Sequence, residues 1–349
     1  MNKRGVHMKV ALIGLSGYAG KVLYQLLGGH SRVNQVNIYD HNVHEVTTVA
    51  DTYKGMIGNR DRVYPYDYSK IMNKNDAAFF ATPAGVTSKL AQPFIHEGFP
   101  VIDLSGDYRL TDPQTYEDWY HKPAAVSGLD EAEYGIADFN HLASTTNYVA
   151  NPGCYATATL TGLKPVFNSD MFSLDSVIVD AKSGTSGAGK KLTESSHFTN
   201  VNENLSVYKP NQHQHIPEIM QQLVEWNHEA KPIQFTTSLL PISRGIMATM
   251  YVKAKPDVEF SEIDELFAAE LADAPFTRYT GAELPDIKEV VGTNFCDVGI
   301  AFNDINQTLM IVSVIDNLIK GASGQAVQNF NQMFGFAEDE GLKLAQVTV

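Results

Sequence analysis

Residues 9–20 read KVALIGLSGYAG, a short apolar run followed at once by glycines at positions 14, 17 and 20. The apolar run is typical of a buried strand, and the residues after Gly20 favour a helix. Glycines in such a turn let the backbone approach a pyrophosphate while the N–H groups of the helix point toward it. The segment therefore predicts a dinucleotide site, although Ser16 stands where the common pattern has its second glycine. A tight strand–helix connection without a ligand would use the same residues.

Strand and helix patterns alternate through the first part of the chain. Strands are expected over residues 36–40, 77–81 and 101–104, and a helix over residues 88–97. This alternation is typical of a parallel, doubly wound α/β sheet of the Rossmann type. Asp40 closes the second predicted strand, where a carboxylate can bind a ribose 2′-hydroxyl, and a role in the turn fits it equally well.

The pattern changes near Tyr148. From here on, longer strands typical of an α+β domain and one late helix are expected over residues 177–180, 235–239, 246–253, 298–302, 310–315 and 322–334. A chain of 349 residues is longer than one hydrophobic core usually fills, so two domains are expected, with the first ending near residue 150.

The composition argues against several classes of protein. A net charge of −14 disfavours nucleic-acid binding, which needs a basic surface to displace counterions. The chain has two cysteines far apart and no secretory leader, which favours the reducing cytoplasm over a disulfide scaffold. No apolar run approaches the length that spans a membrane, so no membrane association is expected.

Cys154 follows Asn151-Pro152-Gly153 and precedes a run of small residues that reads as a helix. A thiol at a helix N-terminus lies in the positive end of the helix dipole and beside unpaired N–H groups, and both favour the reactive thiolate. Packing in the core is the alternative, but the tight Pro-Gly turn favours an accessible nucleophile. Cys296 is flanked by strand-like residues, and there packing is the better interpretation.

Two histidines, His213 and His215, precede a helix that is expected to begin at Pro217, with Glu218 in its first turn. A thiolate nucleophile needs a partner for its proton, so one of the two histidines is the expected general acid/base, and the sequence does not choose between them. Alternating histidines can also bind a metal ion. No further ligands lie near them in the sequence to complete a site, so no metal is expected.

Anionic groups of a substrate require donors, and three segments supply candidates. Residues 182–190, KSGTSGAGK, form a glycine- and serine-rich loop after a strand, suited either to anion binding or to a flexible surface loop. Arg109 and Arg244 lie in loops that contain glycine, where each could bind a carboxylate or phosphate with two bonds or form a solvated ion pair. Lys182, Arg109 and Arg244 are therefore the expected substrate-binding residues.

A dinucleotide loop, a cysteine at a helix start and a histidine pair together indicate one reaction class. The cysteine attacks a carbonyl carbon, hydride passes between the adduct and a nicotinamide, and a histidine handles the proton. Eight blocks carry a resemblance to the N-acetyl-γ-glutamyl-phosphate reductase family, which is related to aspartate-semialdehyde dehydrogenase: residues 14–20, 103–109, 151–157, 182–189, 213–219, 243–246, 291–296 and 316–326.

The resemblance implies a Rossmann-type dinucleotide-binding domain over residues 1–150 and an α+β semialdehyde-dehydrogenase catalytic and dimerisation domain over residues 151–316. It also implies that residues 317–349 pack back on the first domain. The implied activity is the NADPH-dependent reduction of N-acetyl-γ-glutamyl phosphate to the semialdehyde in arginine biosynthesis, through a thioester on Cys154. Homodimers or homotetramers are expected from the family.

The implied cofactor-binding residues are Gly14, Ser16, Gly17, Tyr18, Ala19, Asp40, Pro83, Ser183, Gly184 and Asn317. The chain departs from the family at Asp40, where relatives usually have a segment of the Ser/Arg type that suits a 2′-phosphate. A carboxylate there repels that phosphate, so NADP is expected and NAD is possible. Ala84 stands where the family typically has histidine. The alternatives are another acyl-phosphate substrate, or a nicotinamide-binding regulator without catalysis, which the presence of Cys154 and both histidines disfavours.

Overall fold

The chain forms two compact units in a computed structural model that describes residues 7–344. The first unit consists of residues 7–152 and 322–343, and the second of residues 153–321 and Leu344. The chain passes between them after Pro152 and after Gly321, where the sequence analysis expected the changes after residues 150 and 316. The expected outer limits at residues 1 and 349 lie outside the described residues.

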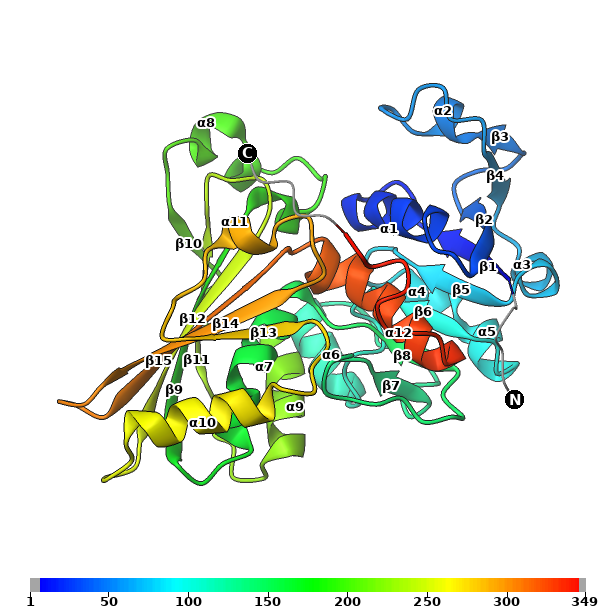
Figure 1. Ribbon diagram of the computed structural model, residues 1–349. Coiled ribbons are helices and arrows are strands. Elements are labelled where there is room, and N and C mark those ends of the chain that lie inside the picture. The colour runs from blue at the N-terminus through cyan, green and yellow to red at the C-terminus, as the bar shows by residue number, and fades with distance from the viewer. Residues whose placement is uncertain (1–6, 345–349) are drawn as a thin grey trace. The chain divides into compact units, whose positions relative to one another are not determined.

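The first unit is built on an eight-stranded sheet with the order β3-β4-β2-β1-β5-β6-β8-β7 (Figure 1). All its neighbouring strands are parallel except β3 and β4. This confirms the predicted doubly wound sheet, in which strands buried on both faces are almost wholly apolar. The strands are β1 Met8–Ile13, β2 Val33–Asp40, β3 Thr47–Thr48, β4 Arg62–Pro65, β5 Ala77–Phe80, β6 Val101–Asp103, β7 Ala132–Tyr134 and β8 Tyr148–Ala150.

The helices of the first unit are α1 Tyr18–Gly28, α2 Val49–Thr52, α3 Tyr68–Lys74, α4 Thr87–Leu90, α5 Gln92–His96, α6 Pro113–Tyr120 and α12 Gly324–Phe334. The single helix predicted over residues 88–97 was wrong, because two short helices stand there. Pro93 explains the break, since its ring displaces the carbonyl four residues earlier and it has no N–H for the helix ladder. It is tolerated in the first turn of α5.

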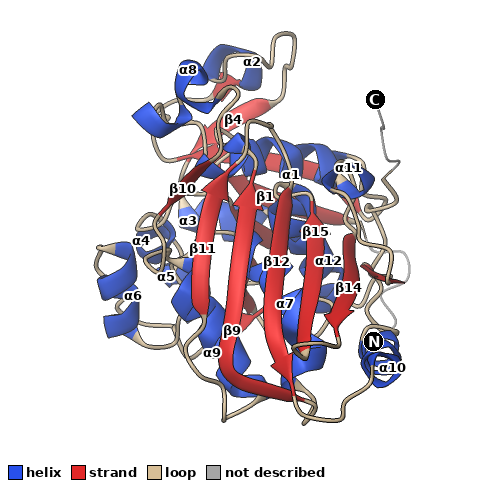
Figure 2. Ribbon diagram, turned by 90° about the vertical axis from the view of Figure 1, so that its left-hand side faces the viewer, coloured by secondary structure: helices blue, strands red, loops and turns tan. Residues whose placement is uncertain are grey.

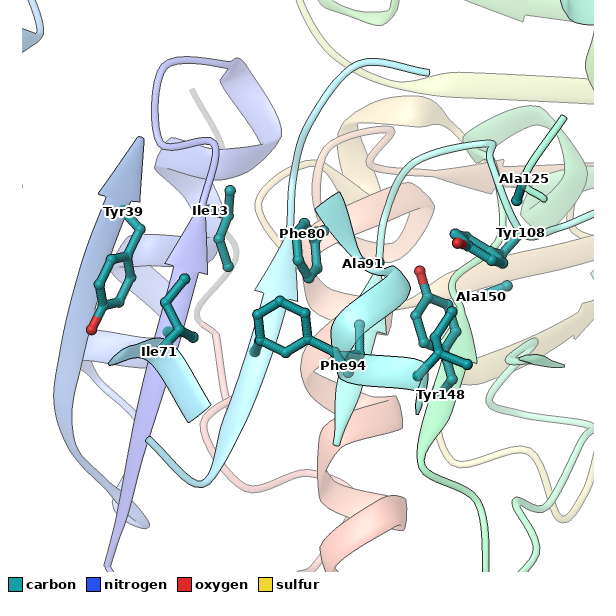
Figure 3. Close-up of a cluster of buried hydrophobic side chains, with 14 residues drawn as sticks. Ile13, Tyr39, Ile71, Phe80, Ala91, Phe94, Tyr108, Ala125, Tyr148 and Ala150 are labelled. Carbon is teal, nitrogen blue, oxygen red and sulfur yellow. The ribbon is translucent and has the colours of Figure 1, made fainter. Parts of the chain in front are cut away.

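An aromatic cluster packs along one face of the central strands (Figure 3). Phe80 at the end of β5 meets Phe94 of α5 edge to face, with ring centroids 5.5 Å apart. Tyr108 and Tyr148 belong to the same cluster and pack against each other, with ring centroids 4.7 Å apart. Aromatic pairs of this kind add stability beyond the area that they bury. The cluster therefore joins β5, β8 and α5 in one apolar core.

Helix α12 belongs to the first unit although it follows the second unit in the sequence. Its Phe330 is buried against Phe79 of β5, with ring centroids 5.5 Å apart. The amide nitrogen of Asn329 donates to the carbonyl of Gly135 and to the side-chain oxygen of Asn151. The helix thus completes both the apolar core and a buried polar network of this unit.

The second unit is built on a seven-stranded mixed sheet with the order β10-β11-β9-β12-β15-β14-β13. The mixed sheet with separate helices confirms the predicted α+β class: Figure 2 shows β11, β9, β12, β15 and β14 side by side with α7 and α9 behind them. The strands are β9 Phe172–Ser183, β10 Ser206–Tyr208, β11 Gln234–Leu239, β12 Ile246–Ala254, β13 Thr277–Gly281, β14 Cys296–Asn303 and β15 Thr308–Ile315. The helices are α7 Cys154–Phe167, α8 Phe198–Val201, α9 His215–Trp226, α10 Phe260–Glu270 and α11 Ile287–Val290, with a π-helical turn at Ile319–Ser323.

Helix α7 is buried along almost its whole length, because it packs against the sheet on one side and α9 on the other. Helix α9 buries a stripe three and four residues apart that includes His215, Glu218 and Ile219, the spacing of one helix face. The described residues contain no helix that is long and apolar enough to cross a membrane.

Candidate active site

Cys154 is the first residue of α7, as its sequence context predicts. The preceding Gly153 is the N-cap, with extended backbone at φ −75° and ψ 153°. The cysteine is partly exposed and in no disulfide, whereas Cys296 is fully buried with its sulfur 3.2 Å from the hydroxyl of Ser313. The first turn of a helix carries N–H groups without partners in the helix, so the thiol lies where a thiolate is stabilised.

Glu218 connects the start of α7 to the helix that carries the histidines. Its Oε1 accepts the N–H of Gly153 at 2.7 Å, and its side chain is buried. The sequence analysis placed Glu218 in the first turn of α9 but assigned it no role. The available signal was its spacing of three from His215, which puts both side chains on one helix face.

The two histidines lie together with their ring centroids 4.7 Å apart. Tyr155, the residue after the cysteine, packs against both, at 5.1 Å from His213 and 6.1 Å from His215. The expected helix start at Pro217 was wrong: α9 begins at His215, because Gln214 is already in the helical region and Pro217 needs no N–H partner in a first turn. His215 is therefore a helix residue and not part of an extended segment.

His213 stays uncharged at neutral pH. Its Nδ1 accepts the backbone N–H of His215 at 3.2 Å, so the proton of the neutral ring is on Nε2. Burial lowers the pKa of His213 to about 2, with further lowering from the charges of His215 and Lys209. Protonation of His213 would place a positive charge among buried, largely aromatic side chains, away from the water that stabilises it.

A pair of tyrosine hydroxyls lies beside the cysteine, and the sequence analysis did not find it. The hydroxyls of Tyr155 and Tyr208 are 2.8 Å apart. Burial raises the pKa of Tyr208 to about 12, and the charge of a Cys154 thiolate contributes to the rise. Tyr208 stands in the short strand β10 with no local motif, so only the folded chain brings it to the cysteine.

The loop over residues 182–190 was expected to be either an anion-binding loop or a flexible surface loop, and several of its backbone N–H groups are bonded within the protein. Residues Thr185–Ala188 form a 3₁₀ turn. The N–H groups of Gly184, Thr185 and Ser186 donate to the carbonyls of Gly245, Ile242 and Ser243. These donors are occupied by a second loop, so they do not form an anion site.

Lys182 is not brought together with the cysteine group. Side chains alternate along a strand, so Lys182 lies on the face of β9 opposite Ala181 and Ser183, which are buried. Its ammonium pairs with Asp180, two residues earlier on the same face. Ser183 and Asn317 are buried, and Asn317 bonds the N–H of Gly245 at 2.8 Å and the hydroxyl of Ser186 at 2.9 Å.

Arg244 pairs with Asp316, which is fully buried. Arg109 lies in the first unit and donates from Nε to the carbonyl of Asn151 and from Nη2 to the carbonyl of Leu104, both at 2.8 Å. Two of the donors of Arg109 therefore brace the backbone that leads toward the cysteine.

The glycine loop of the first unit has the features of a dinucleotide site. Gly14 has φ of +103°, and a Cβ there would lie 2.5 Å from the carbonyl oxygen of Ala81. A Cβ on Gly20 would collide with the carbonyl of Gly14. A Cβ on Gly17 would meet nothing within 4 Å, so the chain leaves space over the first turn of α1, beside Tyr18 and Ala19, where a pyrophosphate fits.

These contacts predict opposite effects for two alanine substitutions. Gly17→Ala is expected to leave the thermal unfolding temperature nearly unchanged and to weaken dinucleotide binding by about tenfold, because the new methyl group occupies the phosphate space. Gly14→Ala is expected to cost about 1–3 kcal/mol of stability, since it forces an L-residue into strained backbone. Calorimetry and a fluorescence titration with the dinucleotide measure the two effects. Unchanged binding in Gly17→Ala would contradict the assignment.

Asp40 is held within the first unit. Its Oδ2 accepts the hydroxyl of Tyr53 at 2.8 Å, and its Oδ1 accepts the N–H of Asn42 at 2.9 Å. The loop around Pro83 is held by Asp107, because the carboxylate of Asp107 accepts the N–H groups of Gly85 and Ser88. Asp40 is the last residue of β2, and Pro83 lies in the loop after β5. Both therefore lie at the carboxyl ends of parallel strands, the edge at which such sheets bind ligands.

No cluster of three or more His, Cys, Asp or Glu side chains suited to a metal ion occurs in residues 7–344.

Two family descriptions match the chain. Residues 9–146 match the semialdehyde dehydrogenase NAD-binding domain, and residues 154–317 match the semialdehyde dehydrogenase dimerisation domain. Together they span both units.

Curated relatives match nearly end to end. The N-acetyl-gamma-glutamyl-phosphate reductase of Limosilactobacillus fermentum is 54% identical, covering 97% of this chain and 99% of the relative. The N-acetyl-gamma-glutamyl-phosphate reductase 2 of Lactiplantibacillus plantarum is 49% identical over 96% and 98%. The Listeria monocytogenes reductase of the same name is 46% identical over 97% and 99%.

Solved structures share the fold at low identity. Aspartate semialdehyde dehydrogenase II of Vibrio cholerae has a TM-score of 0.70 at 16% identity, covering 94% of this chain and 98% of that one. Aspartate semialdehyde dehydrogenase of Candida albicans has a TM-score of 0.66 at 13% identity, covering 95% and 99%.

Proposed function

The chain belongs to the N-acetyl-gamma-glutamyl-phosphate reductase family of semialdehyde dehydrogenases, and we propose that it reduces N-acetyl-γ-glutamyl phosphate to N-acetylglutamate semialdehyde, releasing phosphate, in arginine biosynthesis. The observation that carries this proposal is the placement of Cys154 at the start of α7, with Gly153 held by Glu218 and with Tyr155 packed on the histidine pair. This group supplies a nucleophile, a proton partner and a fixed geometry.

Cys154 acts as the acyl acceptor. Its thiolate forms a bond to the acyl carbon, the bond from that carbon to the phosphate oxygen breaks, and phosphate leaves with the electron pair. A bound nicotinamide dinucleotide supplies the hydride that reduces the resulting thioester. The carbon–sulfur bond then breaks, the aldehyde is released, and the thiol is restored. The N–H groups at the start of α7 stabilise the charge on the thiolate before it attacks and again when the carbon–sulfur bond breaks.

His215 is the general acid/base of this proposal. A group that exchanges protons during turnover needs a pKa near the working pH, and the pKa of His213 is lowered to about 2. His213 instead stays neutral and fixes the chain, because its Nδ1 accepts the N–H of His215. His215 takes the proton from the thiol and gives it to the oxygen of the thiohemiacetal that hydride transfer forms. It takes this proton back as the carbon–sulfur bond breaks and the aldehyde is released, and then returns it to the sulfur. Glu218 positions the nucleophile by holding the N–H of Gly153.

The first unit binds the nicotinamide dinucleotide through Gly14, Ser16, Gly17, Tyr18 and Ala19, with Pro83 following β5 at the same sheet edge. Ser183, Gly184 and Asn317 are the further proposed cofactor-binding residues. The proposed cofactor is NADPH, which the family assignment supports. Asp40 is the residue that opposes a 2′-phosphate, and its two donors, Tyr53 and Asn42, share its charge without cancelling it.

The proposed substrate and the proposed cofactor are tested together in the reverse reaction, the phosphate-dependent oxidation of N-acetylglutamate semialdehyde. The rates with NADP and with NAD are compared. Wild type is expected to turn over with NADP. Asp40→Asn keeps the acceptor oxygen but loses the charge, so it is expected to lower the KM for NADP about fivefold and to leave that for NAD almost unchanged. Absence of turnover with either cofactor would refute the substrate. Faster turnover with NAD would show that Asp40 determines the cofactor.

The chain is proposed to form homodimers or homotetramers through the second unit. Within the described chain, Figure 2 shows the middle of its seven-stranded sheet uncovered on the face toward the viewer, while α11 packs on β15 of that face through Val290. The strands expose Ile178 and Tyr251 on it, and the partly buried Met310 of β15 pairs with Tyr251. A contiguous apolar face of this kind suits a second copy. The free cysteines support a cytoplasmic location.

A further inference from the structure

Asp316 is the centre of a buried hydrogen-bond network in the second unit. Its side chain is fully buried. Its Oδ1 accepts the N–H groups of Leu318 and Ile319 at 2.9 and 3.1 Å, and its Oδ2 accepts the N–H of Gly292 at 2.8 Å. A carboxylate held by three backbone donors has little freedom to move, so whatever it binds on its remaining side is also fixed.

The group on that side is Arg244. Its Nη2 lies 2.9 Å from both carboxylate oxygens of Asp316. Its Nε is buried and has no hydrogen-bond partner among the described residues, and no acceptor within them bonds Nη1. The side chain is 32% exposed. A guanidinium that is held at one nitrogen, with donors left over and partly open to solvent, is suited to bind an anionic oxygen.

The same segment reaches the nucleophile. The carbonyl of Asp316 accepts the N–H of Gly321 at 3.0 Å within the π-helical turn. A Cβ on Gly321 would lie 2.7 Å from the Cβ of Cys154, so this backbone forms a wall directly against the cysteine. One short segment therefore determines both where Arg244 is held and what lies beside the thiol.

We propose that Asp316 is a positioning residue that holds Arg244 so that its remaining donors bind an anionic oxygen of the substrate, either phosphoryl or carboxylate. The proposal rests on the proposed function for the identity of that substrate. If the Asp316–Arg244 pair had only a structural role, anion binding would not change when Asp316 loses its charge. The proposal predicts that anion binding weakens.

A matched control exists in the same sheet. Arg278 pairs with Asp297, which is also buried, and the Arg278 side chain is partly exposed. Here both Nε and Nη2 donate to the carboxylate, each at 2.6 Å. The guanidinium also lies over the ring of Phe295 at 4.4 Å. Asp297→Asn thus removes the same charge from the same kind of pair with no proposed link to an anion.

The test measures protection of Cys154 from iodoacetamide by inorganic phosphate and, separately, by N-acetylglutamate. The full chain is compared as wild type, Asp316→Asn, Arg244→Lys and Asp297→Asn. At least one anion is expected to protect wild type and Asp297→Asn equally. The half-protecting concentration of that anion is expected to rise about tenfold or more in Asp316→Asn, the loss of one charge-assisted interaction. The anion that shows the rise identifies the group that Arg244 binds.

Arg244→Lys keeps the ion pair but loses the further donors, so it is expected to lose protection even if Asp316→Asn folds poorly. In the variant that combines Asp316→Asn with Arg244→Lys, the anion is expected to protect Cys154 no more weakly than in Arg244→Lys alone, because both changes act on one interaction. Wild-type protection in Asp316→Asn, equal losses in Asp297→Asn, or no protection of wild type by either anion would each overturn the proposal. The assay needs no turnover, so it can succeed or fail independently of the reductase assay.

Discussion

Cys154→Ser is expected to lower the rate of phosphate-dependent semialdehyde oxidation by about four orders of magnitude or more. The start of α7 stabilises a thiolate, whereas a serine hydroxyl at the same place remains un-ionised at neutral pH and is a weak nucleophile toward the carbonyl. The measurement is the appearance of reduced nicotinamide under saturating phosphate and semialdehyde. Dinucleotide binding is expected to be unchanged, since the glycine loop is elsewhere in the chain.

Cys296→Ala is the matched control. This cysteine is buried beside Ser313 and makes no contribution to the proposed chemistry, so the variant is expected to keep wild-type turnover per folded molecule. Turnover in Cys154→Ser within tenfold of wild type, or equal losses in the two cysteine variants, would contradict the assignment of the nucleophile.

His215→Gln is expected to lower kcat by about 10²–10⁴-fold, the usual contribution of a positioned acid/base. His213→Gln is expected to have a smaller effect, about tenfold, because His213 packs against Tyr155 but does not change its protonation state. Since the pKa of His213 is lowered to about 2, its charge stays zero throughout the neutral range. Any loss of activity between about pH 8 and pH 6 must therefore come from another group.

The pH–rate profile separates the two histidines. The acidic limb of the profile is expected to persist in His213→Gln and to disappear in His215→Gln. The reverse result, with the limb lost only in the His213 variant, would transfer the acid/base role to His213. Thermal unfolding of both variants checks that the comparison is between folded proteins.

Two features that depend on local sequence were predicted correctly. The strand–glycine–helix pattern around Gly14 and the helix start at Cys154 both follow from residues that are adjacent in the chain. The start of α9 was misplaced because proline is favoured early in a helix but does not specify which early position it takes.

The features that depend on distant residues were missed. The backbone donors of the loop after β9 are taken by carbonyls near Gly245, and no property of residues 182–190 reveals that pairing. The bond from Glu218 to Gly153 and the meeting of Tyr155 with Tyr208 are also long-range contacts. Such contacts become visible only when helices and strands have been placed in space.

Helix α12 has a consequence for how the protein is made. During translation, residues 7–152 leave the ribosome long before α12, yet Phe330 fills part of their core and Asn329 bonds Gly135 and Asn151. Residues 153–321 contain all the described strands and helices of the second unit, so this unit can fold while synthesis is still under way. The dinucleotide-binding unit, although synthesised first, can complete its core only after α12 has emerged.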